Sequence, residues 1–180
     1  MSNRHNVFVS YHHALDEAYK MMFERFRHIF DVLVSGSVED GDIDSNLPAE
    51  TIRQKIRDEY LRDTSVTVVL IGAESWQRKH IDWEIGSSIR QTEYNPRSGL
   101  FGILLPTYPR NAPTEYNLHT IPPRLYDNIK CEFATIYNWS DNPTTVQGWI
   151  HDAYLRKSTK QPDNSRATFR KNRTGAAWTD

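Results

Sequence analysis

The sequence predicts a single α/β domain in which helices cover both faces of a five-stranded parallel sheet. Three observations support this prediction. Short apolar runs rich in β-branched residues alternate along the chain with longer segments in which apolar residues recur every three or four positions. The chain has 180 residues, the usual size of one domain. The strongest apolar run, residues 66–72 (VTVVLIG), does not alternate with polar residues, which is typical of a parallel strand buried on both faces.

The first half of the chain alternates strands and helices. Residues 6–11 (NVFVSY) are rich in β-branched and aromatic residues and predict the first strand. Residues 14–30 predict an amphipathic helix, and residues 31–35 (DVLVS) predict a second, short strand. A loop with two glycines and four acids follows at residues 36–46, and Pro48 then marks the start of a second helix. The third strand, residues 66–72, leads into a helix predicted over residues 75–91.

The second half adds two strands and a final helix. Residues 100–105 (LFGILL) predict the fourth strand and residues 131–137 the fifth. Five prolines within residues 106–130 exclude a long helix there and predict an irregular segment with room for one short turn. Asn142 and Pro143 open the last helix. The domain is predicted to span residues 1–157, and residues 158–180, with five cations and two acids, predict a flexible basic tail.

The order of these elements predicts where a ligand binds. Strands that alternate with helices form parallel sheets with right-handed crossovers, and the flavodoxin-like strand order 2-1-3-4-5 fits five such strands. In that architecture, ligands bind beyond the carboxyl ends of the strands, where the strand order reverses. A site is therefore expected among residues 10–13, 36–46 and 72–84.

Composition and motifs exclude several function classes. The 22 lysines and arginines nearly balance the 23 acids, so no overall field steers the chain toward nucleic acid or an anionic membrane. The only cysteine, Cys131, excludes an internal disulfide and fits a reducing compartment. There is no signal-peptide pattern and no long apolar run, so a cytoplasmic location is expected. The G-x-G-x-x-G, P-loop and G-x-S-x-G patterns are absent, which argues against the common dinucleotide cradles, P-loop enzymes and α/β-hydrolases.

Glu84 is the most informative single residue. It lies on the helix whose apolar stripe contains Ile81, Ile85 and Ile89, and at 100° per residue it falls beside that stripe, partly buried. A carboxylate at such a boundary has either a structural or a chemical role. The structural alternative is an ion pair on the helix surface with Arg78 or Lys79.

Short motifs in a fixed order resemble those of a known family. Residues 7–11 (VFVSY) end the first strand, residues 67–72 belong to the third, and residues 80–85 (HIDWEI) lie on the helix that follows. This order resembles the TIR domain, most closely the divergent TIR-like group that contains the Thoeris anti-phage protein ThsB. The resemblance extends over residues 6–156, and it rests mainly on the first motif and on the third strand with its helix.

The resemblance implies roles for particular residues. The glutamate on which NAD-cleaving TIR proteins depend corresponds to Glu84, and His80 stands where many members have tryptophan. The end of the first strand would lie beside the nucleotide, and Trp83 is placed to shield Glu84. The residues expected to bind the nucleotide are Phe8, Ser10, Tyr11, His12, Asp40, His80 and Trp83. No metal site is expected, because His12, His13, Asp16 and Glu17 lack a recognised ligand spacing.

The function implied by the resemblance is cleavage of the nicotinamide–ribose bond of NAD⁺, with NAD⁺ as substrate and no further cofactor. The product would be an ADP-ribose-derived signal that activates a partner effector protein after phage infection. The trigger and any homo-oligomer stay open. Two alternatives also stay open: a non-enzymatic TIR module that acts by self-association or adaptor binding, and a sensor that binds ADP-ribose derivatives without cleaving NAD⁺. Only the enzyme requires Glu84 for its activity.

Overall fold

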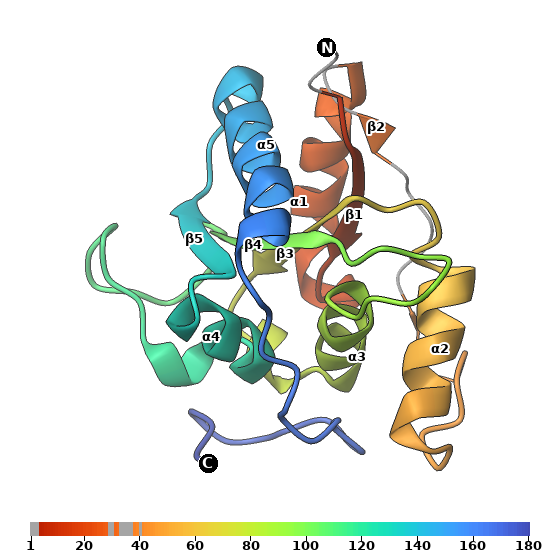
Figure 1. Cartoon of the computed structure of the whole chain (residues 1–180). Helices are drawn as coiled ribbons and strands as arrows, with labels where there is room; N and C mark the ends of the chain where they lie inside the picture. The colour runs from red at the N-terminus through yellow and green to blue at the C-terminus, as the bar shows by residue number, and fades with distance from the viewer. Residues whose placement is uncertain (1–3, 29–30, 33–37, 40) are drawn as a thin grey trace.

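The strands form one parallel sheet in the computed structural model, which describes residues 4–28, 31–32, 38–39 and 41–180 (Figure 1). The strand order is β2-β1-β3-β4-β5, as predicted. Register is continuous across the middle of the sheet, where Val9 of β1 pairs with Val68 of β3 and Val68 pairs with Phe101 of β4. The strands are β1 (Asn6–Ser10), β2 (Asp31–Val32), β3 (Val66–Ile71), β4 (Gly99–Leu104) and β5 (Ala134–Asn138).

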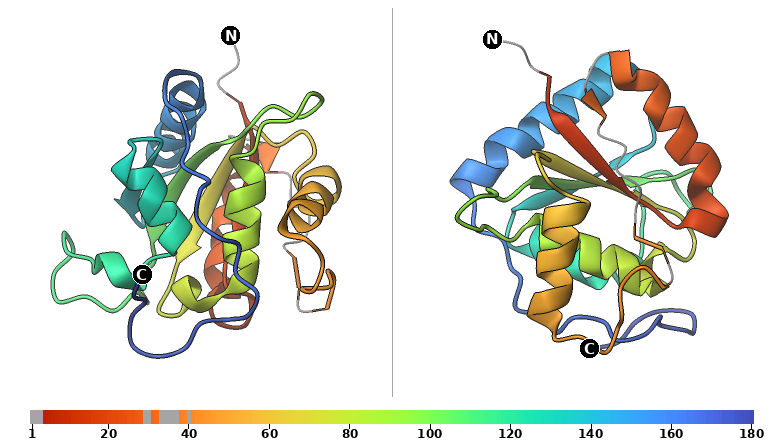
Figure 2. Two further views of the ribbon diagram at one scale, coloured as in Figure 1. Left: turned by 60° about the horizontal axis from the view of Figure 1, so that its bottom comes forward. Right: turned by 90° about the vertical axis from the view of Figure 1, so that its right-hand side faces the viewer.

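Helices cover both faces of the sheet, which confirms the flavodoxin-like α/β class (Figure 2). One core packs α1 and α5 against β1, β3 and β4, and the other face is covered by α2, α3 and α4. The helices are α1 (His13–Glu24), α2 (Ala49–Glu59), α3 (Lys79–Ser88), α4 (Pro123–Lys130) and α5 (Pro143–Thr159). None of the helices in the described part of the chain has both the length and the apolar character to cross a membrane.

The helix predicted over residues 75–91 is divided in two. A 3-10 turn, η2 (Ser75–Gln77), is followed by Arg78 in an extended conformation, and α3 begins only at Lys79. The hydroxyl of Ser75 accepts a hydrogen bond from the backbone N–H of Gly72 at 2.8 Å and contacts the carbonyl of Leu70 at 3.2 Å. The same hydroxyl contacts Oδ2 of Asp16 on α1 at 3.3 Å. Ser75 therefore closes the turn after β3 and contacts α1 instead of capping a long helix.

The proline-rich segment contains a helix that the sequence did not predict. After a 3-10 turn, η3 (Leu118–Thr120), the helix α4 begins at Pro123 and runs for eight residues. Proline is well tolerated at the first helical position, where its missing N–H has no intrahelical partner and its φ angle is already helical. Pro122 and Pro123 therefore mark a helix start, whereas the sequence interpretation treated all five prolines as helix breakers.

The C-terminal segment, defined here as residues 160–180, packs against the domain, and its prediction as a solvated, flexible tail was wrong. Only 7% of Phe169 and 2% of Trp178 is exposed. The segment runs beside α4 and α3 in Figure 1 and in the left view of Figure 2. The indole N–H of Trp178 donates to the carbonyl of Ile121 at 2.8 Å. Burial of these two aromatic side chains provides the apolar contact that holds the segment in place.

Two glycines offer a matched test of the packing between α5 and the sheet. A Cβ at Gly99 would lie 2.2 Å from the backbone carbonyl oxygen of Ala153 on α5, whereas a Cβ at Gly148 would meet nothing within 4 Å. We expect Gly99→Ala to lower the free energy of unfolding by about 1–3 kcal/mol through overpacking. Gly148→Ala should raise it by about 0.5–1 kcal/mol, because alanine favours a helix interior. Urea denaturation of both variants measures the difference, and equal effects would contradict the close approach.

Candidate functional site

Glu84 lies buried beside the end of β1. The apolar stripe of α3 (Ile81, Ile85 and Ile89) packs under the sheet, so the neighbouring Glu84 is carried inward and is only 1% exposed. Its Oε2 accepts a hydrogen bond from the hydroxyl of Ser10 at 2.5 Å, and its Oε1 accepts one from the backbone N–H of Val38 at 2.9 Å. The structural alternative, a surface ion pair with Arg78 or Lys79, is therefore wrong.

Burial determines whether Glu84 is protonated while it is bonded to Ser10 and Val38. Desolvation raises the pKa of Glu84 to about 8, although the hydrogen bonds from Ser10 and Val38 act in the opposite direction. At neutral pH the side chain is therefore mostly protonated. The sequence interpretation assumed an ionised Glu84, which requires either a cationic ligand or access of water.

The raised pKa predicts a pH-dependent stability. A carboxyl group with a pKa of about 8 in the folded state and 4.5 in the unfolded state binds more protons when folded between these values. Its contribution is fully present below pH 4.5 and is lost as the pH rises through 8. We expect the stability of the wild type relative to Glu84→Gln to fall between pH 5 and pH 8.5, as measured by urea denaturation at each pH. A constant difference would contradict the raised pKa.

A cavity of about 390 Å³ lies at the same edge of the sheet, although the buried Glu84 does not itself line it. Val38 joins the two features, since its backbone N–H binds the Glu84 carboxylate while the residue also forms part of the cavity wall. Four of the lining side chains can carry positive charge and only one is acidic. The lining residues are Tyr11, His12, His13, Ala14, Val38, Glu39, Arg78, His80 and Ile81.

The structure brings together some of the predicted nucleotide-binding residues. Tyr11, His12 and His80 line the cavity, and Ser10 binds Glu84 directly. Asp40 lies outside the described residues. These placements leave the binding roles as predictions, but they show which side chains a ligand in the cavity could reach.

Phe8 and Trp83 were also predicted to bind the nucleotide, but neither lines the cavity. Both belong to an apolar cluster with Val38 and the buried face of α2. The indole N–H of Trp83 donates to the carbonyl of Phe169 at 2.7 Å, so this ring faces the C-terminal segment. Trp83 therefore does not line the cavity itself, but its ring packs edge-on against His80, which does.

Arg78, His13 and Glu39 also line the cavity, and the sequence interpretation gave them no binding role. The position of Arg78 directly before α3, at the predicted ligand edge, was the available signal. His12 is buried, and its Nδ1 has no hydrogen-bond partner among the described residues. Burial and the nearby Arg78 lower the pKa of His12, which favours the neutral ring. In the described part of the chain, no three histidine, cysteine or acidic side chains are grouped so that they could hold a metal ion.

The match to a known protein family covers the first four strands. The family described as Thoeris protein ThsB, TIR-like domain, matches residues 8–109, which is more than half of the chain. The chain belongs to this ThsB TIR-like family. No curated protein is similar enough to the chain to stand as a relative. The matched part of the TIR-like domain includes Ser10, Val38 and Glu84, whereas α4, β5, α5 and the C-terminal segment follow it.

Membership connects the protein to a biological system. The ThsB TIR-like family belongs to Thoeris anti-phage defence, so the protein is assigned to that system. The family match covers the strand edge where Glu84 and the cavity lie.

Proposed function

We propose that this protein binds NAD⁺ and breaks its nicotinamide–ribose bond, with Glu84 as the catalytic carboxylate. One observation carries the proposal. A carboxyl group that is 1% exposed lies at the carboxyl-terminal edge of the sheet, held by hydrogen bonds from Ser10 and Val38, and Val38 also lines a cavity with three histidines and one arginine. Buried carboxyl groups with a raised pKa at the edge of a cavity are concentrated at functional sites.

A single carboxylate suffices for this reaction. The bond between the ribose C1′ and the nicotinamide nitrogen breaks with its electron pair going to nitrogen, so the pyridinium leaves as neutral nicotinamide without a general acid. Positive charge then develops on the ribose, as in the oxocarbenium-like transition state of glycoside hydrolysis. An ionised Glu84 stabilises this charge, and the effect is strongest where water is excluded.

Substrate binding supplies the reason for Glu84 to ionise. A positive charge within a few ångströms of a carboxyl group favours its charged form and lowers its pKa. The pyridinium of NAD⁺ is such a charge. Glu84, with a pKa of about 8 when buried alone, is thus expected to lose its proton when the nicotinamide ring binds.

The cavity lining suits the pyrophosphate of a dinucleotide. Arg78 offers positive charge and His12, His13 and His80 offer ring N–H donors, and guanidinium groups bind phosphate oxygens in two-pronged geometry. A cavity of 390 Å³ is at the small end of ligand sites, and Val38 occupies one oxygen of Glu84. The proposal therefore requires Val38 to move away when NAD⁺ binds. The rate of NAD⁺ cleavage is accordingly expected to be low until a trigger causes this movement.

The attacking group determines the product. Water gives ADP-ribose, a nucleophile of the same molecule gives a cyclic isomer, and a foreign nucleophile gives a conjugate. In Thoeris defence, such a nucleotide would act on an associated effector protein. The trigger is expected to derive from the phage.

The test is incubation of the purified protein with NAD⁺, with and without lysate of phage-infected cells, with mass spectrometry of the nucleotides. We expect nicotinamide to appear together with an ADP-ribose-derived product in the presence of the infected lysate. The same lysate without the protein is the control. If NAD⁺ stays intact under both conditions, the proposal fails and a non-enzymatic association module is favoured.

A further inference from the structure

The C-terminal segment curves around a second cavity, of about 590 Å³. It is lined by Trp76 of η2 and by residues 167–174 and 177–179. None of these residues lines the cavity beside Glu84. Apart from Trp76, all of them follow the region matched by the ThsB TIR-like family, so this cavity is an addition to the shared part of the domain.

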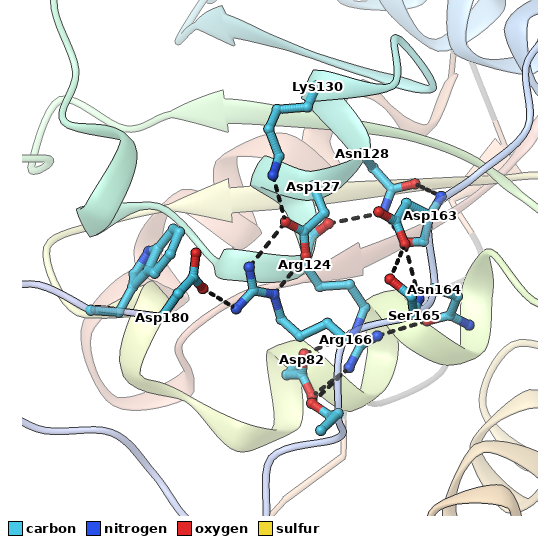
Figure 3. A network of polar contacts seen from close by, with 12 residues as sticks. Asp82, Arg124, Asp127, Asn128, Lys130, Asp163, Asn164, Ser165, Arg166 and Asp180 are labelled. Carbon is cyan, nitrogen blue, oxygen red and sulfur yellow. Dashed lines mark hydrogen bonds and ion pairs between the residues drawn. The ribbon is translucent and has the colours of Figure 1, made fainter.

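The charges of this cavity are all of one sign. Two of the five cations in the C-terminal segment are neutralised, because Lys160 pairs with Glu132 and Arg166 pairs with Asp127 and Asp180. Figure 3 shows the two pairs of Arg166. The other three line the cavity, and no ion pair joins them to a carboxylate in the described part of the chain. They are Arg170, Lys171 and Arg173. No aspartate or glutamate contributes to the lining.

Two of these cations are held in fixed positions. Nη1 of Arg170 donates to the carbonyls of Ser45 at 3.2 Å and Leu47 at 2.9 Å. The guanidinium carbon of Arg173 lies 4.4 Å from the centre of the Phe169 ring. Burial and the nearby positive charge of Arg166 lower the pKa of Arg173, although Asp82 and Asp180 act in the opposite direction. Donors that are already held in position lose little entropy when an anion binds.

We propose that this cavity is a second ligand site, which binds an organic diphosphate. The three lining cations, which form no ion pair in the described part of the chain, match the charge of a diphosphate, and phosphate oxygens accept hydrogen bonds from arginine and lysine. The volume of 590 Å³ lies in the range of small-molecule sites. Trp76, Phe169 and Trp178 supply the apolar part of the wall for the organic group.

The test uses the tryptophans as local probes in the full-length protein. Titrations with ADP, inorganic pyrophosphate and adenosine are followed by ¹⁵N NMR of the indole N–H groups. We expect ADP and pyrophosphate to shift the signals of Trp76 and Trp178 in a saturable way, with adenosine at least tenfold weaker. Trp139, whose indole N–H binds Asp141, is the remote reference. Adenosine binding as tightly as ADP, or no saturable shift up to 5 mM of either phosphate, would overturn the site.

Variants separate this cavity from general electrostatic attraction. Arg173→Gln combined with Lys171→Gln should weaken ADP binding at Trp76 and Trp178 by at least tenfold. Lys171→Gln alone should weaken it about threefold, and this exposed side chain has no packing role. Lys55→Gln removes one positive charge at an exposed position on α2, as Lys171→Gln does at the cavity, and it should leave ADP binding unchanged. If all three variants bind ADP with the affinity of the wild type, the assignment is overturned.

Discussion

Replacing Glu84 by glutamine is expected to lower the rate of NAD⁺ cleavage by about 100–1,000-fold, the effect of removing one electrostatic group that stabilises the transition state. Glutamine has nearly the same shape, and its amide oxygen can still accept the hydrogen bond from Val38. It carries no negative charge, so the positive ribose loses its stabilising partner. The measurement is nicotinamide release by the activated protein, with wild type and variant treated with the same infected-cell lysate.

The matched control is Glu93→Gln, the same chemical change at an exposed position. It should leave nicotinamide release unchanged. The free energy of unfolding shows whether a loss of activity reflects lost chemistry or lost folding. Because burial disfavours the charged form of Glu84, the variant with the neutral glutamine should be at least as stable as the wild type at pH 8. Undiminished turnover by a folded Glu84→Gln variant would contradict the catalytic assignment.

Local patterns were sufficient to predict most of the fold. The apolar run at residues 66–72 predicted the central strand because burial on both faces leaves no room for alternation, and β3 is buried at every position. The failures involve distant contacts. The hydroxyl of Ser75 contacts Asp16, 59 residues away in sequence, and Trp178 inserts beside Ile121, 57 residues away. No local periodicity carries such information, so the divided helix and the packed C-terminal segment were missed.

The site was predictable only where side chains define it. Glu84 and Ser10 were identified from the order of short motifs, and the structure joins them at 2.5 Å. Val38 was missed because it contributes a backbone N–H, which every residue except proline possesses. Arg78 was predicted only as an ion-pair partner, although its place at the predicted ligand edge pointed to the cavity. The sequence predicted a continuous helix there and not the extended conformation that Arg78 adopts between η2 and α3.

A large loss of stability is expected when the ion pair that connects α3 to α4 is broken. Asp82 and Arg124 are 2% and 1% exposed, and Nε of Arg124 lies 2.8 Å from Oδ1 of Asp82 (Figure 3). The other oxygen of Asp82 accepts the backbone N–H of Phe169 at 3.0 Å. The pair therefore also anchors the C-terminal segment to the helix that carries Glu84.

Arg124→Met should lower the free energy of unfolding by about 3–5 kcal/mol, because it leaves the Asp82 carboxylate buried without its counter-charge. Adding Asp82→Asn should recover part of this loss, since neither charge then remains to be desolvated. Lys160→Met is the control: it breaks a pair whose side chains are 42% and 73% exposed, and we expect a loss below about 1 kcal/mol.

Urea denaturation measures the free energy of unfolding of the three variants. Hydrogen exchange at the Phe169 amide reports whether the C-terminal segment loosens when the ion pair is broken. Exchange should accelerate in Arg124→Met and stay slow in Lys160→Met, because only the first change disturbs the carboxylate that binds this amide. Since Asp82 precedes Glu84 by two residues on α3, a loosened pair should also shift the position of the Glu84 carboxyl group. Equal destabilisation by the two methionine variants would show that the buried pair does not fix α3.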